Sequence, residues 1–237
     1  MKKIQKNGLL IMISILLAGI SSCDKDNNIA AFEVFGDVII IKRMVGDQSK
    51  FARSYYAYGN YQMSSAEVTL PEGGTIVLAS PDESKRVYLK EPAIVDYENE
   101  PPTTGNFDFT VVNEDIEHTV SDQLVFNNLA YANITRAEYT AGAAMVEWES
   151  VPDADNYVVQ MHDTDNNIVF TGFLVSPANH IYQISANNGA WETTPVGGGT
   201  YIIEIHTLEY EDGATSANSE YNINEISISS QSIVWGN

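Results

Sequence analysis

The sequence predicts an all-β protein made of two β-sandwiches that follow an N-terminal signal segment. Short runs rich in β-branched and aromatic residues recur at a spacing of roughly 8–12 residues, with Gly, Pro, Asn and Asp between them. After the first 23 residues no stretch keeps a 3.6-residue apolar period for three turns, so little helix is expected. A length of 237 residues, 44% of them hydrophobic, suits about two small globular domains.

The first half of the chain contains a series of strand candidates that end at turn residues. The candidates at residues 34–44 and 51–58 are followed by the turn residues Gly46-Asp47 and Gly59-Asn60. The candidates at residues 107–112 and 117–120 are expected to form a hairpin across Asn113-Glu114-Asp115. The candidates span residues 34–44, 51–58, 66–70, 75–79, 86–90, 107–112 and 117–120.

A polar, proline-interrupted stretch, residues 98–106, is either a domain linker or a long loop. We expect a loop, because the strand after it needs sheet partners and the segment that follows is too short to supply them. The domain boundary is therefore predicted later, near Asn127-Asn128.

In the second half, Val146-Glu147-Trp148 is followed by the run Pro152 to Val159, which has the form P-x-A-x-x-Y-x-V. This spacing resembles the B and C strands of fibronectin type III domains. Residues 199–207 resemble the F strand of that family, and Glu211-Asp212-Gly213 followed by Ser216 resembles its F–G turn. Residues 168–175 and 180–184 can serve as the C′ and E strands.

The resemblance covers residues 128–237 and implies that Trp148 fills the core while Tyr157 packs from the facing strand. One departure is the long connection 185–199, which carries Trp191. Residues 31–127 look like a second, immunoglobulin-like sandwich, although no single motif identifies it.

The N-terminus has the pattern of a secretory signal. Lys2, Lys3 and Lys6 precede an apolar run, residues 9–20, which at 12 residues is too short to span a bilayer. Ile20-Ser21-Ser22-Cys23 resembles the lipobox of bacterial lipoproteins, which implies cleavage before Cys23 and acylation of this residue.

The tether, residues 24–30, begins with an acidic segment that resembles, in part, the surface-export signal of Bacteroidetes-type lipoproteins. The resemblance implies a lipid-anchored protein of the outer membrane that faces the cell exterior. A periplasm-facing lipoprotein with a plain polar tether is the alternative.

The charge excludes one class of partner. The chain has 12 Lys and Arg against 32 Asp and Glu, and cleavage before Cys23 would change the net charge from −20 to −23. Residues 137–237 contain no Lys or Arg and 14 acidic residues. A nucleic-acid-binding role is not expected, because such proteins cluster cations against phosphates.

Motifs for catalysis or cofactor binding are missing from the sequence. A single Cys excludes disulfide frameworks and Cys-based zinc sites. Residues 163–167 begin like a calcium loop, but Ile168 and Leu174 stand where an EF-hand needs Gly and Glu, so a hairpin turn is expected. The histidines have no His or Cys at ligand spacing and are expected to be structural or solvated: His118, His162, His180 and His206. We therefore predict no enzyme activity, no cofactor and no metal site.

Aromatic side chains are the remaining binding candidates. Tyr56 and Tyr58 alternate onto one strand face, and Trp191 lies in a glycine-rich loop. Exposed aromatic rings can stack on sugars, although ordinary sheet packing would also explain the two tyrosines. The sequence therefore predicts a non-enzymatic surface lipoprotein that acts in adhesion or protein interaction. A glycan-binding accessory of an outer-membrane polysaccharide uptake system is the alternative, and a structural spacer is a third, weaker interpretation.

Overall fold

The computed structural model describes residues 31–185, 187–214 and 222–236, and these residues form an almost entirely β protein. The predicted all-β class is confirmed. The described residues contain one helical turn, the 3-10 helix η1 (Ile94–Asp96). No helix among them is long and apolar enough to cross a membrane. The signal segment, Cys23 and the tether lie outside the described residues.

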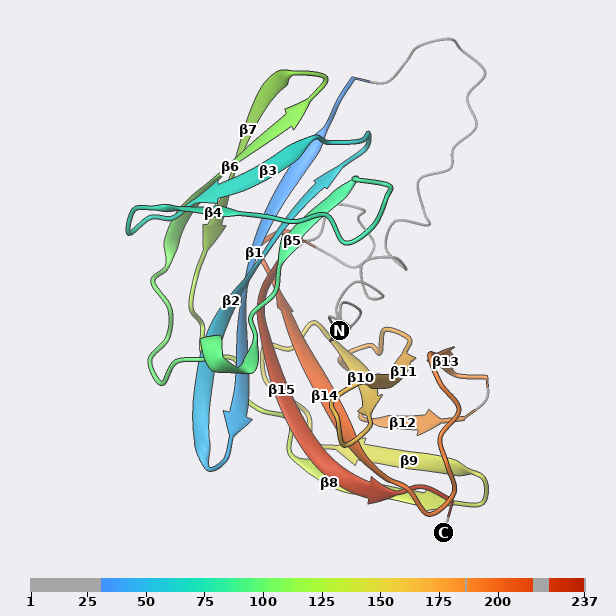
Figure 1. The fold of residues 1–237 in the computed structure, drawn as a ribbon. Coiled ribbons are helices and arrows are strands. Elements are labelled where there is room, and N and C mark those ends of the chain that lie inside the picture. Colours follow the sequence, from blue (N-terminus) through green and yellow to red (C-terminus); the bar gives the residue numbers. More distant parts are fainter. Residues whose placement is uncertain (1–30, 186, 215–221, 237) are drawn as a thin grey trace.

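One large sheet of eight strands runs the length of the molecule (Figure 1). Its strands are, from edge to edge, β13 (Gly189–Trp191), β11 (Ile168–Gly172), β10 (Asn156–His162), β14 (Thr200–Tyr210), β15 (Ile223–Val234), β1 (Val34–Val45), β2 (Gln48–Gly59) and β5 (Val87–Lys90). All neighbours pair antiparallel except β1 and β15, which pair parallel with Ile41 opposite Ile226.

Two smaller sheets lie at the two ends of the large one (Figure 1). The four-stranded sheet consists of β4 (Thr75–Val77), β3 (Ser65–Thr69), β6 (Gly105–Asn113) and β7 (Ile116–Leu124). The three-stranded sheet consists of β12 (Ile181–Ile184), β9 (Ala143–Trp148) and β8 (Ile134–Thr140). The predicted loop at 98–106 is confirmed up to Gly105, where β6 begins, and β6 and β7 form the predicted hairpin.

Alternation along the strands sends side chains into separate cores. Val38 and Ile40 of β1 pack in the first core with Phe107 and Phe109 of the four-stranded sheet. A second core fills the space between the large sheet and the three-stranded sheet. It contains Trp148 and Tyr157, which are both buried and pack against each other as predicted. The centroids of their rings lie 5.3 Å apart.

A third core lies on the opposite face of the large sheet and contains residues from both halves of the chain. Ile39 and Ile41 of β1 pack there with Val158 of β10, Leu208 of β14 and Ile226 of β15. The boundary predicted near Asn127-Asn128 falls in the connection between β7 and β8, yet this core and the β1–β15 ladder join the two halves.

Gly36 of β1 gives a test of this packing. A Cβ on Gly36 would stand 2.3 Å from Cδ2 of the buried Phe109, so Gly36→Ala should overpack the first core and lower the free energy of unfolding by about 1–3 kcal/mol. Gly197→Ala is the matched control, because a Cβ there meets nothing within 4 Å. Urea unfolding measures both variants. Equal stability of the two would contradict this packing.

Candidate functional site

Trp191, predicted as an exposed binding residue, is a half-buried part of the second core. Its ring lies 4.8 Å from the Phe170 ring and 5.6 Å from the Trp235 ring, measured between centroids. The indole Nε1 donates a hydrogen bond to the Ser185 carbonyl at 3.1 Å. The long connection that departs from the fibronectin pattern thus contains a short edge strand, β13, which tucks this ring against the core.

Tyr56 and Tyr58 share one face of β2, as predicted, but they do not form an exposed pair. Tyr56 is fully buried, and its ring stacks on the half-buried Tyr58 with centroids 5.9 Å apart. The Tyr56 hydroxyl donates to Glu91 at 3.3 Å, and burial raises the pKa of Tyr56 well above its usual value. The prediction that Tyr56 offers a ring to a ligand is therefore wrong, because the third core covers it.

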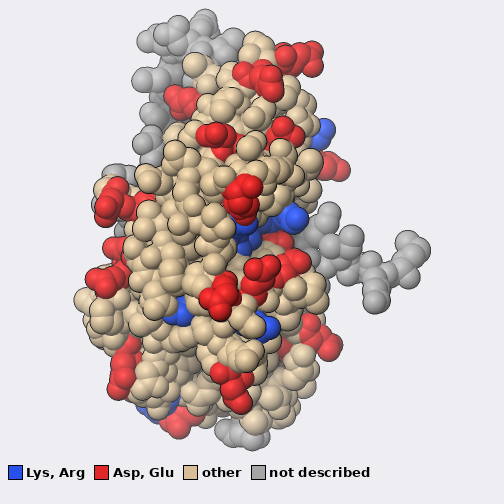
Figure 2. Space-filling model, turned by 90° about the vertical axis from the view of Figure 1, so that its left-hand side faces the viewer, with Lys and Arg blue, Asp and Glu red and all other residues tan. Residues whose placement is uncertain are grey.

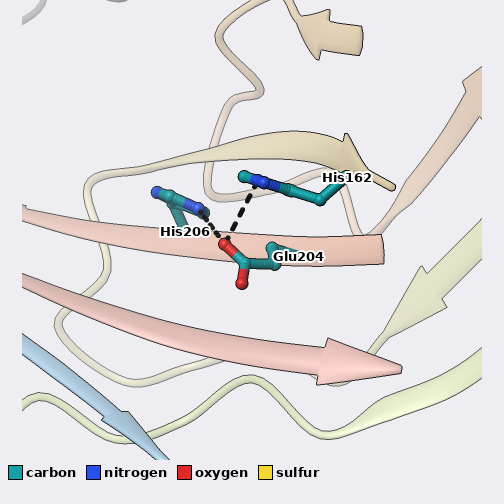
Figure 3. Close-up of side chains that lie close together, drawn as sticks. All are labelled: His162, Glu204 and His206. Carbon is teal, nitrogen blue, oxygen red and sulfur yellow. Dashed lines mark hydrogen bonds and ion pairs between the residues drawn. The ribbon is translucent and has the colours of Figure 1, made fainter. Parts of the chain in front are cut away.

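Two histidines that looked isolated in the sequence meet in the large sheet. His162 ends β10, while Glu204 and His206 lie two residues apart on β14 and so share a face. In the β10–β14 ladder Gln160 stands opposite Glu204, which brings His162 over the same carboxylate. Figure 3 shows both imidazole rings directed at Glu204.

The geometry of this cluster is tight. Nε2 of His206 lies 3.0 Å and Nε2 of His162 lies 3.4 Å from the same atom, Oε2 of Glu204. The side chains of His162, Glu204 and His206 are 8%, 4% and 7% exposed. His162 and His206 are buried and hydrogen-bonded, as structural histidines are, but their spacing in the sequence did not predict that they would lie together. The missed signal was the E-x-H alternation on a strand, which places two ligand-type side chains together.

Arg43 of β1 connects this cluster to the first half of the chain. Its Nη2 donates to Oε1 of Glu204 at 3.0 Å and so reaches across β15, which separates β1 from β14. The carboxylate is therefore bound on both oxygens, by the Arg43 guanidinium on one and by the His206 imidazole on the other. Nε2 of His162 lies 3.4 Å from the second oxygen and hydrogen-bonds to Oε1 of Gln160 at 3.2 Å.

The environment fixes the charge states of two members of this cluster. Burial alone would raise the pKa of Glu204, but the hydrogen bond from His206 and the positive charges around it lower the pKa to about 2. Burial lowers the pKa of His162, an effect that the Glu204 charge opposes. Glu204 is therefore an anion at neutral pH.

A second group of close titratable residues contains only acids. Asp37 of β1, Asp122 of β7 and Glu211 after β14 bring their carboxyl oxygens within 4.8 Å of one another. Burial and repulsion by the neighbouring carboxylates raise the pKa of Asp37, and burial and contact with Glu211 raise the pKa of Asp122 to about 8. A proton held among these carboxyls relieves their repulsion.

The loop that begins like a calcium site is a turn, as predicted. Oδ1 of Asp163 accepts hydrogen bonds from the backbone N–H groups of Asp165 and Asn167, at 3.0 and 2.7 Å, and the turn joins β10 to β11. These contacts use the carboxylate to hold the hairpin.

The distribution of charged side chains on the surface agrees with the acidic composition of the chain. Figure 2 shows acidic side chains scattered over one face, with only a few Lys and Arg among them. No continuous basic patch is visible on that face.

Comparison with known proteins adds little to this description. Searches against protein families and against curated proteins found no match. Among solved structures, the chain is similar to a two-domain fibronectin type III segment of chicken tenascin, at 11% identity and a TM-score of 0.27, covering 75% of this chain and 91% of that one. It is also similar to the BSP domain of a biofilm-associated protein, at 14% identity and a TM-score of 0.25, covering 78% of this chain and 28% of that one.

Asp122 generates a pH prediction. Because its pKa is about 8 in the folded protein and near 4 when unfolded, the folded state holds a proton that the unfolded state releases. This contribution is fully present below pH 4 and falls as pH rises toward 8, by at most about 1.4 kcal/mol per pH unit. Asp122→Asn removes the titration and keeps an oxygen acceptor for the Val38 N–H, which lies 2.6 Å away.

Urea unfolding at pH 5 and pH 8 checks this expectation. The loss of stability between the two values should be smaller in Asp122→Asn than in the wild type, and unchanged in the control Asp108→Asn, which alters an exposed carboxylate on β6. An identical pH dependence in all three proteins would show that Asp122 titrates normally.

Proposed function

We propose that this protein is a non-enzymatic interaction module, held at the outer surface of the cell by lipid on Cys23. The observation that carries the proposal is the large sheet that runs through both halves of the chain. Because β1 and β15 pair side by side, the large sheet resists bending between the two halves of the chain. An anchor attached to the start of β1 would therefore also fix the position of the opposite end of the sheet.

The position of β1 relative to Cys23 supports the same proposal. Val34, the first residue of β1, stands 11 positions after Cys23, a length of chain that spans at most about 36–40 Å. A lipid on Cys23 would keep the N-terminal end of β1 close to the membrane. The three-stranded sheet lies at the opposite end of the molecule from that point (Figure 1), so it would face outward.

The half that would face outward also has exposed apolar side chains. Phe173 and Leu174, which follow β11, are 54% and 43% exposed. Exposed apolar side chains of this size suit contact with another protein better than contact with water.

The glycan-binding alternative has no comparable support. It was based on Trp191, Tyr56 and Tyr58, and these rings pack within the protein. A glycan would need a different surface, and a polysaccharide array probed with residues 24–237 tests for one directly.

Cell fractionation and surface proteolysis test the anchoring. Wild-type protein should sediment with membranes and be cleaved by protease added to intact cells, whereas Cys23→Ala should be recovered in the soluble fraction because it has no acylation site. Membrane association of Cys23→Ala would refute the lipid anchor, and complete protection of the wild type would refute outward exposure.

Binding of labelled residues 24–237 to intact cells tests the interaction role. Saturable binding that unlabelled protein displaces supports it, and Phe173→Ser together with Leu174→Ser should weaken that binding. Non-saturable background on cells and on the polysaccharide array alike would favour a spacer.

A further inference from the structure

We propose that His162, Glu204 and His206 form a binding site for one divalent transition-metal ion, with Zn²⁺ as the ion that the site fits best. This site is independent of the proposed function. Two imidazole nitrogens and one carboxylate oxygen are a donor set typical of zinc sites that keep a fourth position for water.

The distances between the donor atoms suit a tetrahedral ion. Bonds of about 2.0–2.1 Å place the ligands of a tetrahedral zinc about 3.3 Å apart. The two imidazole Nε2 atoms lie 3.0 and 3.4 Å from Oε2 of Glu204, and the three residues' donor atoms all lie within 4.8 Å of one another. Small side-chain rotations would centre an ion among them.

The backbone holds the donors in place. Gln160 pairs with Glu204 and Val158 with His206 in the β10–β14 ladder, which is internal to the sheet. Arg43 binds Oε1 of Glu204, so this carboxylate offers Oε2 to the two histidines. Hydrogen bonding of the second oxygen is the usual way in which proteins orient a carboxylate ligand.

Hydrogen bonding within the described part of the chain does not satisfy this cluster. Nδ1 of His206 and Nε2 of Gln160 are buried there without a partner. Buried polar atoms nearly always have partners, so these two point to an ordered water beside the cluster. The ion itself would contact neither, because Nδ1 lies away from the Nε2 donor on the ring and the Gln160 amide nitrogen is a hydrogen-bond donor.

The donor set also predicts selectivity. Nitrogen-rich sites favour Zn²⁺ and its neighbours in the transition series, whereas Ca²⁺ and Mg²⁺ prefer oxygen ligands. The group of Asp37, Asp122 and Glu211 has only oxygen donors, and burial and mutual repulsion raise the pKa values of Asp37 and Asp122, so the group holds a proton. We assign no ion to it.

Calorimetric titration of the EDTA-treated chain without its proposed lipidated cysteine, residues 24–237, with Zn²⁺ tests the proposal. One equivalent should bind, and Zn²⁺ at about 100 times its Kd should raise Tm by roughly 5–10 °C. Ca²⁺ and Mg²⁺ should do neither. Absence of saturable Zn²⁺ binding, or equal binding of Ca²⁺, would overturn the proposal.

Ligand variants locate the site. His162→Gln and His206→Gln should each weaken Zn²⁺ binding by more than the roughly 10–100-fold that loss of an outer-shell contact costs. The control is His118→Gln on β7, a histidine outside the cluster, which should bind like the wild type. Wild-type affinity in His162→Gln would show that zinc binds elsewhere.

A measurement on the wild type covers the case in which a ligand variant does not fold. Zn²⁺ should shift the NMR signals of the His162 and His206 rings and leave that of His118 unchanged. Shifts confined to His118, His180 or the backbone would reject the site.

Discussion

The parallel pairing of β1 and β15 is the contact on which the rest of the structure depends. It joins the first strand of one sandwich to the last strand of the other, so the sheets that would form two separate domains become one sheet of eight strands. Both strands are buried on both faces over most of the shared region, which is expected of strands at the centre of a sheet. The third core exists only because this pairing places apolar residues of both halves on one face.

Polar contacts also connect the two halves of the chain along β1. Nζ of Lys42 donates to Oδ1 of Asn128 and to the Leu129 carbonyl, both at 2.8 Å, and Arg43 reaches Glu204 from the adjacent position on β1. The acidic group likewise combines Asp37 and Asp122 with Glu211 of the other half. The Lys42 and Arg43 contacts partly remove a charged group from water, a cost that is offset by its partner in the other half.

The sequence predicts local elements well and their long-range partners poorly. Trp148 and Tyr157 could be placed in a core because the strand and turn spacing around them is specific. The F–G turn implied a final strand without giving its residues, and the pairing of that strand, β15, with β1 nearly 200 residues earlier was not predicted. The burial of Tyr56 could not be predicted either, because the third core that covers it combines β1 and β2 with β10, β14 and β15 from the other half of the chain. The histidine cluster depends on strand register, which no single segment of the sequence contains.

Unfolding of a variant in the first core, monitored in the second, tests this account most directly. The chain's three tryptophans, Trp148, Trp191 and Trp235, all pack in the second core. Val111→Ala, a cavity in the first core, should cost about 2 kcal/mol. If the shared sheet makes the halves one cooperative unit, this variant lowers the urea midpoint of tryptophan fluorescence as much as that of far-ultraviolet circular dichroism. An unchanged fluorescence midpoint beside an earlier circular-dichroism transition would contradict it and establish two independent domains.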